Sequence, residues 1–400
     1  MRGIKKRGSG LRASCAAAAL SLAVCPLAAN AVSFSGNNWN VDISGFINAF
    51  YTTASCSGSS VGGYALAGEA LGCGGSGERT SIGNGLLPNA LITKFKTQQQ
   101  GIDIGAQISF MNSIATGNGI TRNGSIDVRQ AFFTLGTAEF GTVKLGRDYG
   151  IFGYNGIIND MTLLGVGAPA IAFQDGQALG GIGRVSFGHI GAGYTYLGNY
   201  SQIVYTSPTF NGLSFTGGVF NPSDNLTGNY DGRTVPQVQG AVNYGNGPFK
   251  VWVGAKAQKF YQKPVTSPDK GFWMSAGEIG GSVAAGPLSL MANVQAGRGI
   301  GILSDGDQGP TTGVNYLVQA NYQILPKWKV GLNYGVNRNT KDPGVAYANF
   351  KSNANATAGL YYQITKAINL DLELGKTWSK DYLGNQDHAN SVAVGGMIFF

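Results

Sequence analysis

The sequence contains 400 residues, of which 64 are glycine and only 12% are charged. Hydrophobic residues reach 43%, which excludes a disordered chain, and the glycines follow no G-X-Y period, which excludes collagen. The formal net charge is +8, but five of the basic residues lie in the first 31 positions. The rest of the chain is therefore nearly neutral and predicts no nucleic-acid partner.

The first 31 residues have the pattern of a secretory signal peptide. Five basic residues precede the apolar stretch ASCAAAALSLAVCPLAA, which leads into the small-residue motif ANA at 29–31. We expect cleavage after Ala31 and a mature, exported domain of residues 32–400. That domain contains no uninterrupted apolar run of about 18 residues, so any membrane-spanning part must be built from strands.

Two cysteines remain once the signal peptide is removed. They are Cys56 and Cys73, and in an exported protein a pair at this spacing usually forms a disulfide. The bond would close one loop and stabilise the fold by roughly 3 kcal/mol. The alternative is that they stay free, exposed thiols.

The mature chain consists of segments in which apolar side chains occupy every second position. In GIDIGAQISF, residues 101–110, Ile102, Ile104 and Ile108 lie on one face and Gln107 lies on the other. A helix would need apolar residues three and four positions apart, so these segments predict strands.

The connections between these segments alternate between short and long. With antiparallel strands, this alternation places every long loop at one end of the sheet and every short turn, with both termini, at the other. We expect sixteen strands in all. The short turns are 98–101, 137–141, 208–212, 245–248, 285–287, 325–327 and 365–367, and the long loops are about 54–86, 113–124, 150–200, 221–235, 262–271, 298–312, 340–353 and 380–389.

This asymmetry, with aromatic residues near the strand ends, is typical of a transmembrane β-barrel. A soluble β-sandwich would also place aromatic residues at its edges, but it would not explain the alternation of loop lengths. In hydrocarbon an open strand edge leaves backbone groups unsatisfied, so the strand that begins at Trp39 must pair with the strand that ends at Phe400. Sixteen strands enclose a water-filled lumen.

Two stretches resemble the Gram-negative general porin family. They are VRQAFFTLGTAEFGTVKLGRDYG at 128–150 and IVYTSPTFNGLSFTGGVF at 203–220, and the terminal aromatic Phe400 is a third similarity. The resemblance implies an all-β fold, a 16-stranded antiparallel transmembrane β-barrel with an inward-folded constriction loop. It further implies a homotrimer in the lipids of the bacterial outer membrane with both termini in the periplasm. The expected function is passive diffusion of small hydrophilic solutes and ions. Phe400 would be an assembly signal for the outer-membrane assembly machinery.

The third loop, about residues 150–200, is the constriction loop by this resemblance. It is the longest connection and contains the apolar stretch MTLLGVGAPAIAF, which has no reason to face water. We expect it to pack against the inner wall of the barrel.

Five charged residues are candidates for the pore constriction. By the resemblance, Arg147 matches a wall arginine and Arg129 is a second basic candidate, while Asp160 and Asp175 are the acids of the loop. Lys94, which shares a face with Lys96, is a candidate for a lower part of the lumen.

The alternation of GTVKLGRDY leaves one orientation open. Arg147 falls on the same face as Val143 and Leu145, opposite Lys144, so only one of the two basic residues can line the lumen unless a bulge intervenes. The resemblance favours Arg147.

Nothing in the sequence predicts an enzyme. Its two histidines are His189 and His388, and Ser391 would lie on the opposite face of an extended chain from His388, which is poor geometry for a catalytic triad. The sequence contains no Cys/His metal cluster, P-loop or dinucleotide motif, so we expect no metal and no cofactor. Two alternatives to a general porin remain: a substrate-specific channel with a binding track in the lumen, and a barrel that is not a channel.

Overall fold

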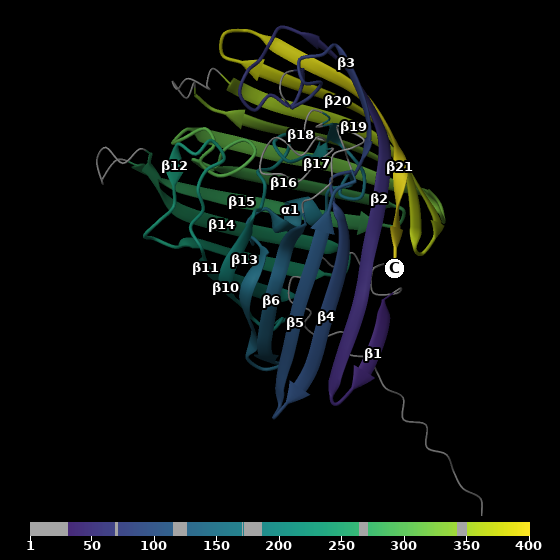
Figure 1. The fold of residues 1–400 in the computed structure, drawn as a ribbon, viewed down its shortest axis with the longest axis vertical. Coiled ribbons are helices and arrows are strands. Elements are labelled where there is room, and N and C mark those ends of the chain that lie inside the picture. The colour runs from purple at the N-terminus through teal and green to yellow at the C-terminus, as the bar shows by residue number, and fades with distance from the viewer. Residues whose placement is uncertain are drawn as a thin grey trace, which may run out of the picture.

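The chain forms a closed antiparallel β-barrel (Figure 1). The computed structural model describes residues 31–68, 71–114, 126–169, 171, 186–263, 271–341 and 350–400. Within these residues sixteen strands form the wall, and β2 pairs with β21 to close it. The wall strands are β2 (Trp39–Gly58), β4 (Asn89–Gln99), β5 (Ile102–Asn112), β6 (Asp127–Thr137), β7 (Gly141–Tyr149), β10 (Asn199–Thr206), β11 (Leu213–Phe220), β13 (Gln237–Asn246), β14 (Phe249–Gln262), β15 (Gly271–Ala285), β16 (Leu288–Arg298), β17 (Thr312–Leu325), β18 (Trp328–Asn339), β19 (Phe350–Thr365), β20 (Ile368–Asp381) and β21 (Gln386–Phe399).

Six short elements add to this wall. β1 (Val32–Gly36) and β3 (Glu78–Gly83) pair with β2, and β12 (Tyr230–Asp231) pairs with β14. Inside the barrel, the segment between β7 and β10 contains α1 (Tyr154–Ile158), β8 (Ala168–Pro169) and β9 (Ser186–Gly188). Among the described residues, no helix is long and apolar enough to cross a membrane.

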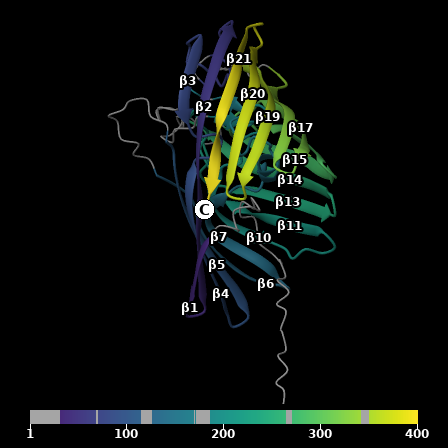
Figure 2. The same cartoon turned by 90° about the vertical axis from the view of Figure 1, so that its right-hand side faces the viewer.

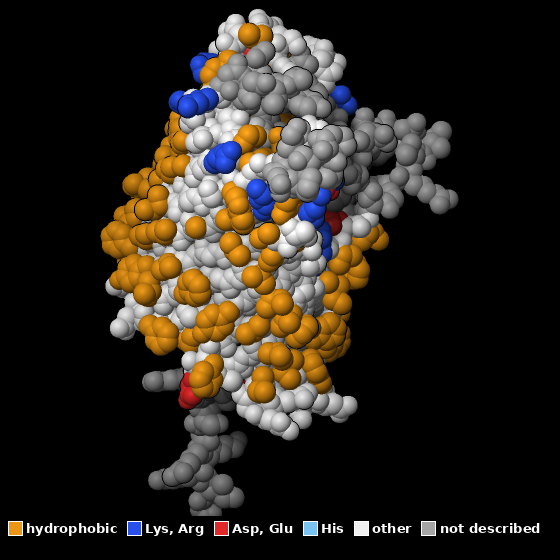
Figure 3. Space-filling model, turned by 90° about the vertical axis from the view of Figure 1, so that its left-hand side faces the viewer, with side chains coloured by type: hydrophobic (Ala, Val, Ile, Leu, Met, Phe, Trp, Pro, Cys, Tyr) orange, Lys and Arg blue, Asp and Glu red, His pale blue; other side chains and the backbone are white. Residues whose placement is uncertain are grey.

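The two faces of each wall strand differ in polarity. In β20, Leu370, Leu372 and Leu374 are exposed on the outside, whereas Asp371 and Glu373 between them are buried inside. Figure 3 shows the result on one side of the molecule, where hydrophobic side chains form a broad band below Lys and Arg side chains. An apolar exterior with a polar interior is the pattern of an outer-membrane barrel.

The expected all-β barrel of sixteen strands is confirmed, and two loop boundaries differ from expectation. The first loop is shorter than 54–86, because β2 continues to Gly58 and β3 pairs with it. The last loop contains only residues 382–385, because Asp381 accepts hydrogen bonds from the backbone of Leu383 and Asn385 and so forms a tight turn. The turn-forming carboxylate makes this connection as short as those at the other end.

The barrel closes where β2 meets β21 (Figure 2). Gly45 and Phe400 exchange two backbone hydrogen bonds of 2.8 and 3.0 Å, so the last residue is paired rather than frayed. The rings of Phe46 and Phe399 pack inside this seam with centroids 6.2 Å apart. Below it, β1 continues along β2 from the position at which β21 ends.

Described segments of the loops that connect the wall strands place many apolar side chains inside the barrel. The largest cluster combines the segment between β7 and β10 with wall residues and with residues of the first loop. Its members include Leu66, Tyr154, Leu163, Tyr194, Trp252, Leu303 and Leu317. The described residues of the apolar loop predicted at 150–200 thus pack inside the barrel, as an apolar segment excluded from water should.

We predict that Gly45→Val prevents closure of the barrel. A side chain at Gly45 would collide with the backbone oxygen of Ala90 and lie 2.7 Å from the Phe400 ring. Refolding into detergent, followed by electrophoresis of unheated and heated samples, should show a large loss of the compact, heat-modifiable form. Gly277→Val is the matched control, because its added carbon would meet only a backbone oxygen at 3.9 Å. Equal folded yields for the two variants would contradict the prediction.

Candidate functional site

Polar side chains of the wall hold the inward-folded segment in place. Glu373 accepts hydrogen bonds from the backbone N–H groups of Val166 and Gly167, at 2.9 and 2.8 Å. Gln319 accepts one from Met161 at 2.9 Å. Buried backbone groups outside a sheet need such partners, so these wall residues determine where the segment lies.

A glycine allows the closest of these contacts. A side chain at Gly165 would overlap the Glu373 carboxylate, and Gly165 also accepts a backbone hydrogen bond of 2.8 Å from Leu86. The segment can therefore approach both the wall and the first loop at this point only if residue 165 lacks a Cβ atom.

Asp160 is the centre of a buried polar cluster. The cluster links different parts of the inward-folded segment to one another. Tyr194 donates a hydrogen bond of 2.7 Å to one carboxylate oxygen, and His189 Nδ1 lies 3.2 Å from the same atom. Thr162 donates to the other oxygen from its backbone and its hydroxyl, at 2.9 and 2.8 Å. The Asp160 side chain is completely inaccessible to solvent.

The surroundings of Asp160 favour its charged form. Burial by itself raises the pKa of Asp160, but the His189 ring and the hydrogen bonds from His189, Tyr194 and Thr162 outweigh it and lower that pKa below its ordinary value. Burial and the neighbouring carboxylate raise the pKa of Tyr194 well above its ordinary value, so the phenol stays a donor. Asp160 is thus a structural anion, shielded from passing solutes.

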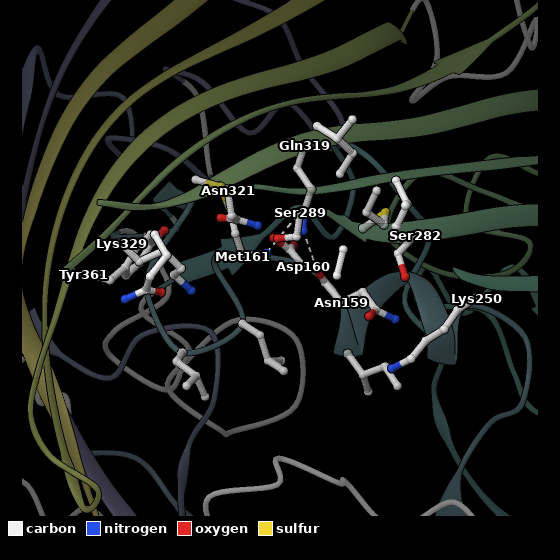
Figure 4. Close-up of a pocket in the computed structure, with 18 of the residues that line it drawn as sticks. Asn159, Asp160, Met161, Lys250, Ser282, Ser289, Gln319, Asn321, Lys329 and Tyr361 are labelled. Atoms are coloured by element: carbon white, nitrogen blue, oxygen red, sulfur yellow. Dashed lines mark hydrogen bonds between the residues drawn. The ribbon is translucent and has the colours of Figure 1, made fainter. Parts of the chain in front are cut away.

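A cavity of about 560 Å³ lies between residues 158–164 of this segment and the barrel wall. Figure 4 shows Lys250 and Lys329 approaching it from opposite sides. Lys327, in the turn between β17 and β18, also lines it, and the carboxylates among its lining residues are those of Asp160 and Asp371. Most other wall groups that line it are neutral and polar, including Ser282, Ser289, Gln319, Asn321, Gln323, Gln363 and Asn369.

The lysines of this cavity differ from the buried basic residues elsewhere in the lumen. Within the described part of the chain, Lys250, Lys327 and Lys329 form no ion pair within 4.0 Å. Lys327 Nζ donates to a backbone oxygen at 2.9 Å, and Lys329 Nζ lies 4.6 Å from the centroid of the Tyr361 ring. Asp371 and Glu373 attract the Lys329 amine without forming a direct ion pair with it, so the three amines face the cavity with their charges at most partly offset.

Ion pairs neutralise three basic residues in other parts of the lumen. These pairs are Arg129 with Asp127, Lys144 with Asp148, and Lys256 with Asp305, and all three basic side chains are buried. A paired, buried charge contributes to the position of the chain more than to the field felt by a solute.

The structure separates the four described residues among the five expected at the constriction. Arg129 is inside the barrel but buried, with its Nε 2.5 Å from Asp127. Asp160 belongs to the buried cluster described above, and Lys94 faces the lumen on the inner face of β4. Asp175 lies outside the described residues. The four described residues do not form one opposed set of acids and bases.

Arg147 requires a correction, because it points outward. It is exposed and pairs in register with Ala131 and Ser201, which are exposed too, and its Nε donates to the backbone oxygen of Val128 at 3.1 Å. The register of β7 against both neighbours is unbroken, so alternation places Lys144, and not Arg147, inside. The resemblance favoured the other orientation; strict alternation predicts the observed one.

Sequence reasoning missed Lys250, Lys327 and Lys329. Alternation alone places Lys250 on the inner face of β14 and Lys329 on the inner face of β18, so that signal was present. Alternation could not show that the amines of these three lysines, on two strands and a turn, lie at one cavity. Elsewhere, Cys56 and Cys73 form a disulfide in the structure, with Cα atoms 6.2 Å apart, a normal separation for such a bond.

A profile of the Gram-negative porin family matches residues 16–382. The chain belongs to this family. It is therefore an outer-membrane channel for passive diffusion, and the family and fold indicate a channel rather than an enzyme. A search of curated proteins found no match.

Solved structures of porins share the fold at low sequence identity. The outer membrane channel DcaP of Acinetobacter baumannii is 16% identical, with a TM-score of 0.67 over 92% of this chain and all of that one. The anion-selective porin from Comamonas acidovorans is 17% identical, with a TM-score of 0.64 over 90% of this chain and all of that one. OmpF of Salmonella typhi, in complex with daunomycin, is 16% identical, with a TM-score of 0.59 over 92% of this chain and all of that one.

We predict that Asp160→Asn loosens the inward-folded segment of this porin. Hydrogen bonds to a charged acceptor stabilise a structure by about 1.5–3 kcal/mol, so the Thr162 amide should exchange with deuterium at least roughly tenfold faster. Hydrogen exchange followed by mass spectrometry measures this. Asp103→Asn, at an exposed carboxylate near a turn, is the control and should leave the segment unchanged.

The same prediction has a defined dependence on pH. The pKa of Asp160 is lower in the folded protein than its ordinary value of 3.8. Its stabilisation is therefore complete above that ordinary value and is lost as the pH falls through the lower, folded-state value. Exchange at Thr162 that is the same in Asp160→Asn and the native chain at neutral pH would contradict the role of this cluster.

Proposed function

We propose that this porin favours small anions over cations. The observation that carries the proposal is the cavity into which Lys250, Lys327 and Lys329 bring three amines without ion-pair partners among the described residues. Of the two carboxylates in its lining, that of Asp160 has both oxygens occupied by hydrogen bonds within its own segment.

Elementary electrostatics supports this choice. One unscreened lysine attracts a monovalent anion 4–8 Å away by roughly 0.5–1 kcal/mol even at the dielectric constant of water, and a narrow lumen with low-dielectric walls strengthens the field. Rings of Lys and Arg are a general means of selecting anions in pores. The similar fold of the anion-selective porin from Comamonas acidovorans is consistent with this proposal.

Lys94 and Lys96 extend the basic surface on the other side of the lumen. Both lie on the inner face of β4, and Lys96 Nζ is 3.4 Å from Asp42, which neutralises it in part. We propose that anions reach the cavity past these groups and then pass between residues 158–164 and the wall.

The neutral lining favours general diffusion over a substrate-specific channel. A specific binding track would require the aromatic residues of the third loop to face this cavity, but Tyr154 and Tyr194 are buried in the core and do not line it. Amide and hydroxyl groups of the wall can replace water around many solutes without selecting one. Current that saturates with a single class of solute would instead favour the specific channel.

We predict that the triple variant Lys250→Gln, Lys327→Gln, Lys329→Gln loses its preference for anions. Removing three unpaired charges should lower the chloride-to-potassium permeability ratio by roughly tenfold. The reversal potential of single channels in a KCl gradient measures this ratio. Lys263→Gln, Lys341→Gln, Lys366→Gln removes the same charge outside the cavity and should leave the reversal potential unchanged. An unchanged potential in the first variant would refute anion selection by this cavity.

We propose further that the porin is a homotrimer with both termini in the periplasm, exported by its 1–31 signal peptide. Phe400 follows β21 at the seam and is 40% exposed, so that it is accessible to the outer-membrane assembly machinery. The lipids of that membrane would contact the apolar exterior.

We predict that unheated protein migrates in a detergent gel as a trimer, and that deletion of Phe400 lowers the trimer yield in cells. The conductance of trimers that do form should be normal, because Phe400 does not line the cavity. Replacing Phe400 by Tyr keeps an aromatic terminus and serves as the control. A normal trimer yield after the deletion would contradict the assembly role.

A further inference from the structure

The outer face of β18, β19, β20 and β21 changes abruptly from apolar to basic. The register of these strands aligns their outward side chains in rows across the wall. The three lower rows are apolar apart from one tyrosine, and they consist of Leu332, Ala358, Leu374 and Val392; Val330, Leu360, Leu372 and Val394; and Trp328, Tyr362, Leu370 and Gly396. They belong to the hydrocarbon-facing band of the barrel.

The next three rows, toward the long loops, carry three basic residues and no acid. These rows are Tyr334, Ala356, Lys376 and Asn390; Val336, Ala354, Trp378 and His388; and Arg338, Ser352, Lys380 and Gln386. Arg338, Lys376 and Lys380 are all exposed. Along β20, the first basic residue follows Leu374 by only two positions, so the basic rows begin directly above the apolar band.

The charges of these three residues are not neutralised within the described residues. None of the three forms an ion pair there. The neighbouring acids Asp381 and Asp387 are buried on the opposite face of the wall, and Asp387 accepts a hydrogen bond from the backbone of Val61. The described part of the barrel therefore supplies no ion-pair partner for these exposed cations.

The spacing of the cations suits one compact anionic group. Arg338 and Lys380 lie in the same row, two strands apart, which places their Cα atoms roughly 10 Å from each other. Between them β19 contributes only the small side chain of Ser352, so no bulky group separates the two basic side chains. Lys376 Nζ lies 5.5 Å from the Trp378 ring, at the level where amphipathic aromatic residues meet lipid headgroups.

We propose that this surface binds the phosphorylated headgroup of a membrane lipid whose acyl chains lie on the apolar rows below. A phosphate carries the charge and the acceptor oxygens that Arg338, Lys380 and the Ser352 hydroxyl can engage together. The basic rows lie directly beside the hydrocarbon-facing band. A lipid can place its headgroup on the basic rows and its acyl chains on the band, whereas a soluble anion can contact only the basic rows. The site is separate from the lumen and does not depend on the proposed anion preference.

The test compares the native porin with the triple variant Arg338→Gln, Lys376→Gln, Lys380→Gln in detergent. Native mass spectrometry counts bound lipid after titration with phosphatidylglycerol or with phosphatidylcholine. Each basic residue near a membrane surface changes the affinity for anionic lipid by roughly fivefold, so the variant should bind phosphatidylglycerol roughly a hundredfold more weakly. The native porin should prefer phosphatidylglycerol to phosphatidylcholine.

Arg233→Gln, Lys263→Gln, Lys341→Gln is the matched control. It removes one arginine and two lysines, and Arg233 and Lys263 already pair with Asp231 and Asp224. Conductance and the mobility of the unheated protein verify that both variants fold. Equal phosphatidylglycerol binding by the two variants, equal binding of both lipids by the native porin, or displacement of the lipid by millimolar inorganic phosphate would overturn the proposal.

Discussion

The lack of water in hydrocarbon is the constraint on which the rest of this structure depends. Each backbone N–H and C=O group in the membrane must find a partner in the wall itself, which only a closed barrel supplies when the chain crosses as strands. The pairing of β2 with β21, down to the hydrogen bonds between Gly45 and Phe400, meets this demand at the seam. Closure then creates an interior with its own chemistry.

Loop segments fill part of that interior. The segment between β7 and β10 brings apolar residues into the lumen, and its backbone groups would be unpaired there without the wall. Glu278, Glu373, Gln239 and Gln319 accept its N–H groups, while Asp160 organises it from within. Glu278, Glu373 and Asp160 thus hold the segment and are not free to oppose the basic residues across the lumen.

The distribution of free charge follows from this use of the acids. Arg129, Lys144 and Lys256 are paired and buried, so the unpaired amines at Lys250, Lys327 and Lys329 dominate the cavity. On the exterior, Arg338, Lys376 and Lys380 lie above an apolar band. The neighbouring described acids, Asp381 and Asp387, are buried on the inner face of the wall. The position of each carboxylate decides which cations remain available.

The sequence by itself determined the barrel. Period-two alternation set the strands and their faces, loop lengths set the topology, and closure required Phe400 to meet the first strand, because strand geometry and backbone pairing are local or follow from a simple rule. Alternation also placed Arg147 on the same face as Val143 and Leu145, although similarity to porins favoured an inward orientation. Only the tertiary structure decided that Asp160 is a buried hydrogen-bond acceptor and that Lys250, Lys327 and Lys329 share one cavity. Those facts depend on how a long loop packs against strands remote in sequence, and no local pattern encodes such contacts.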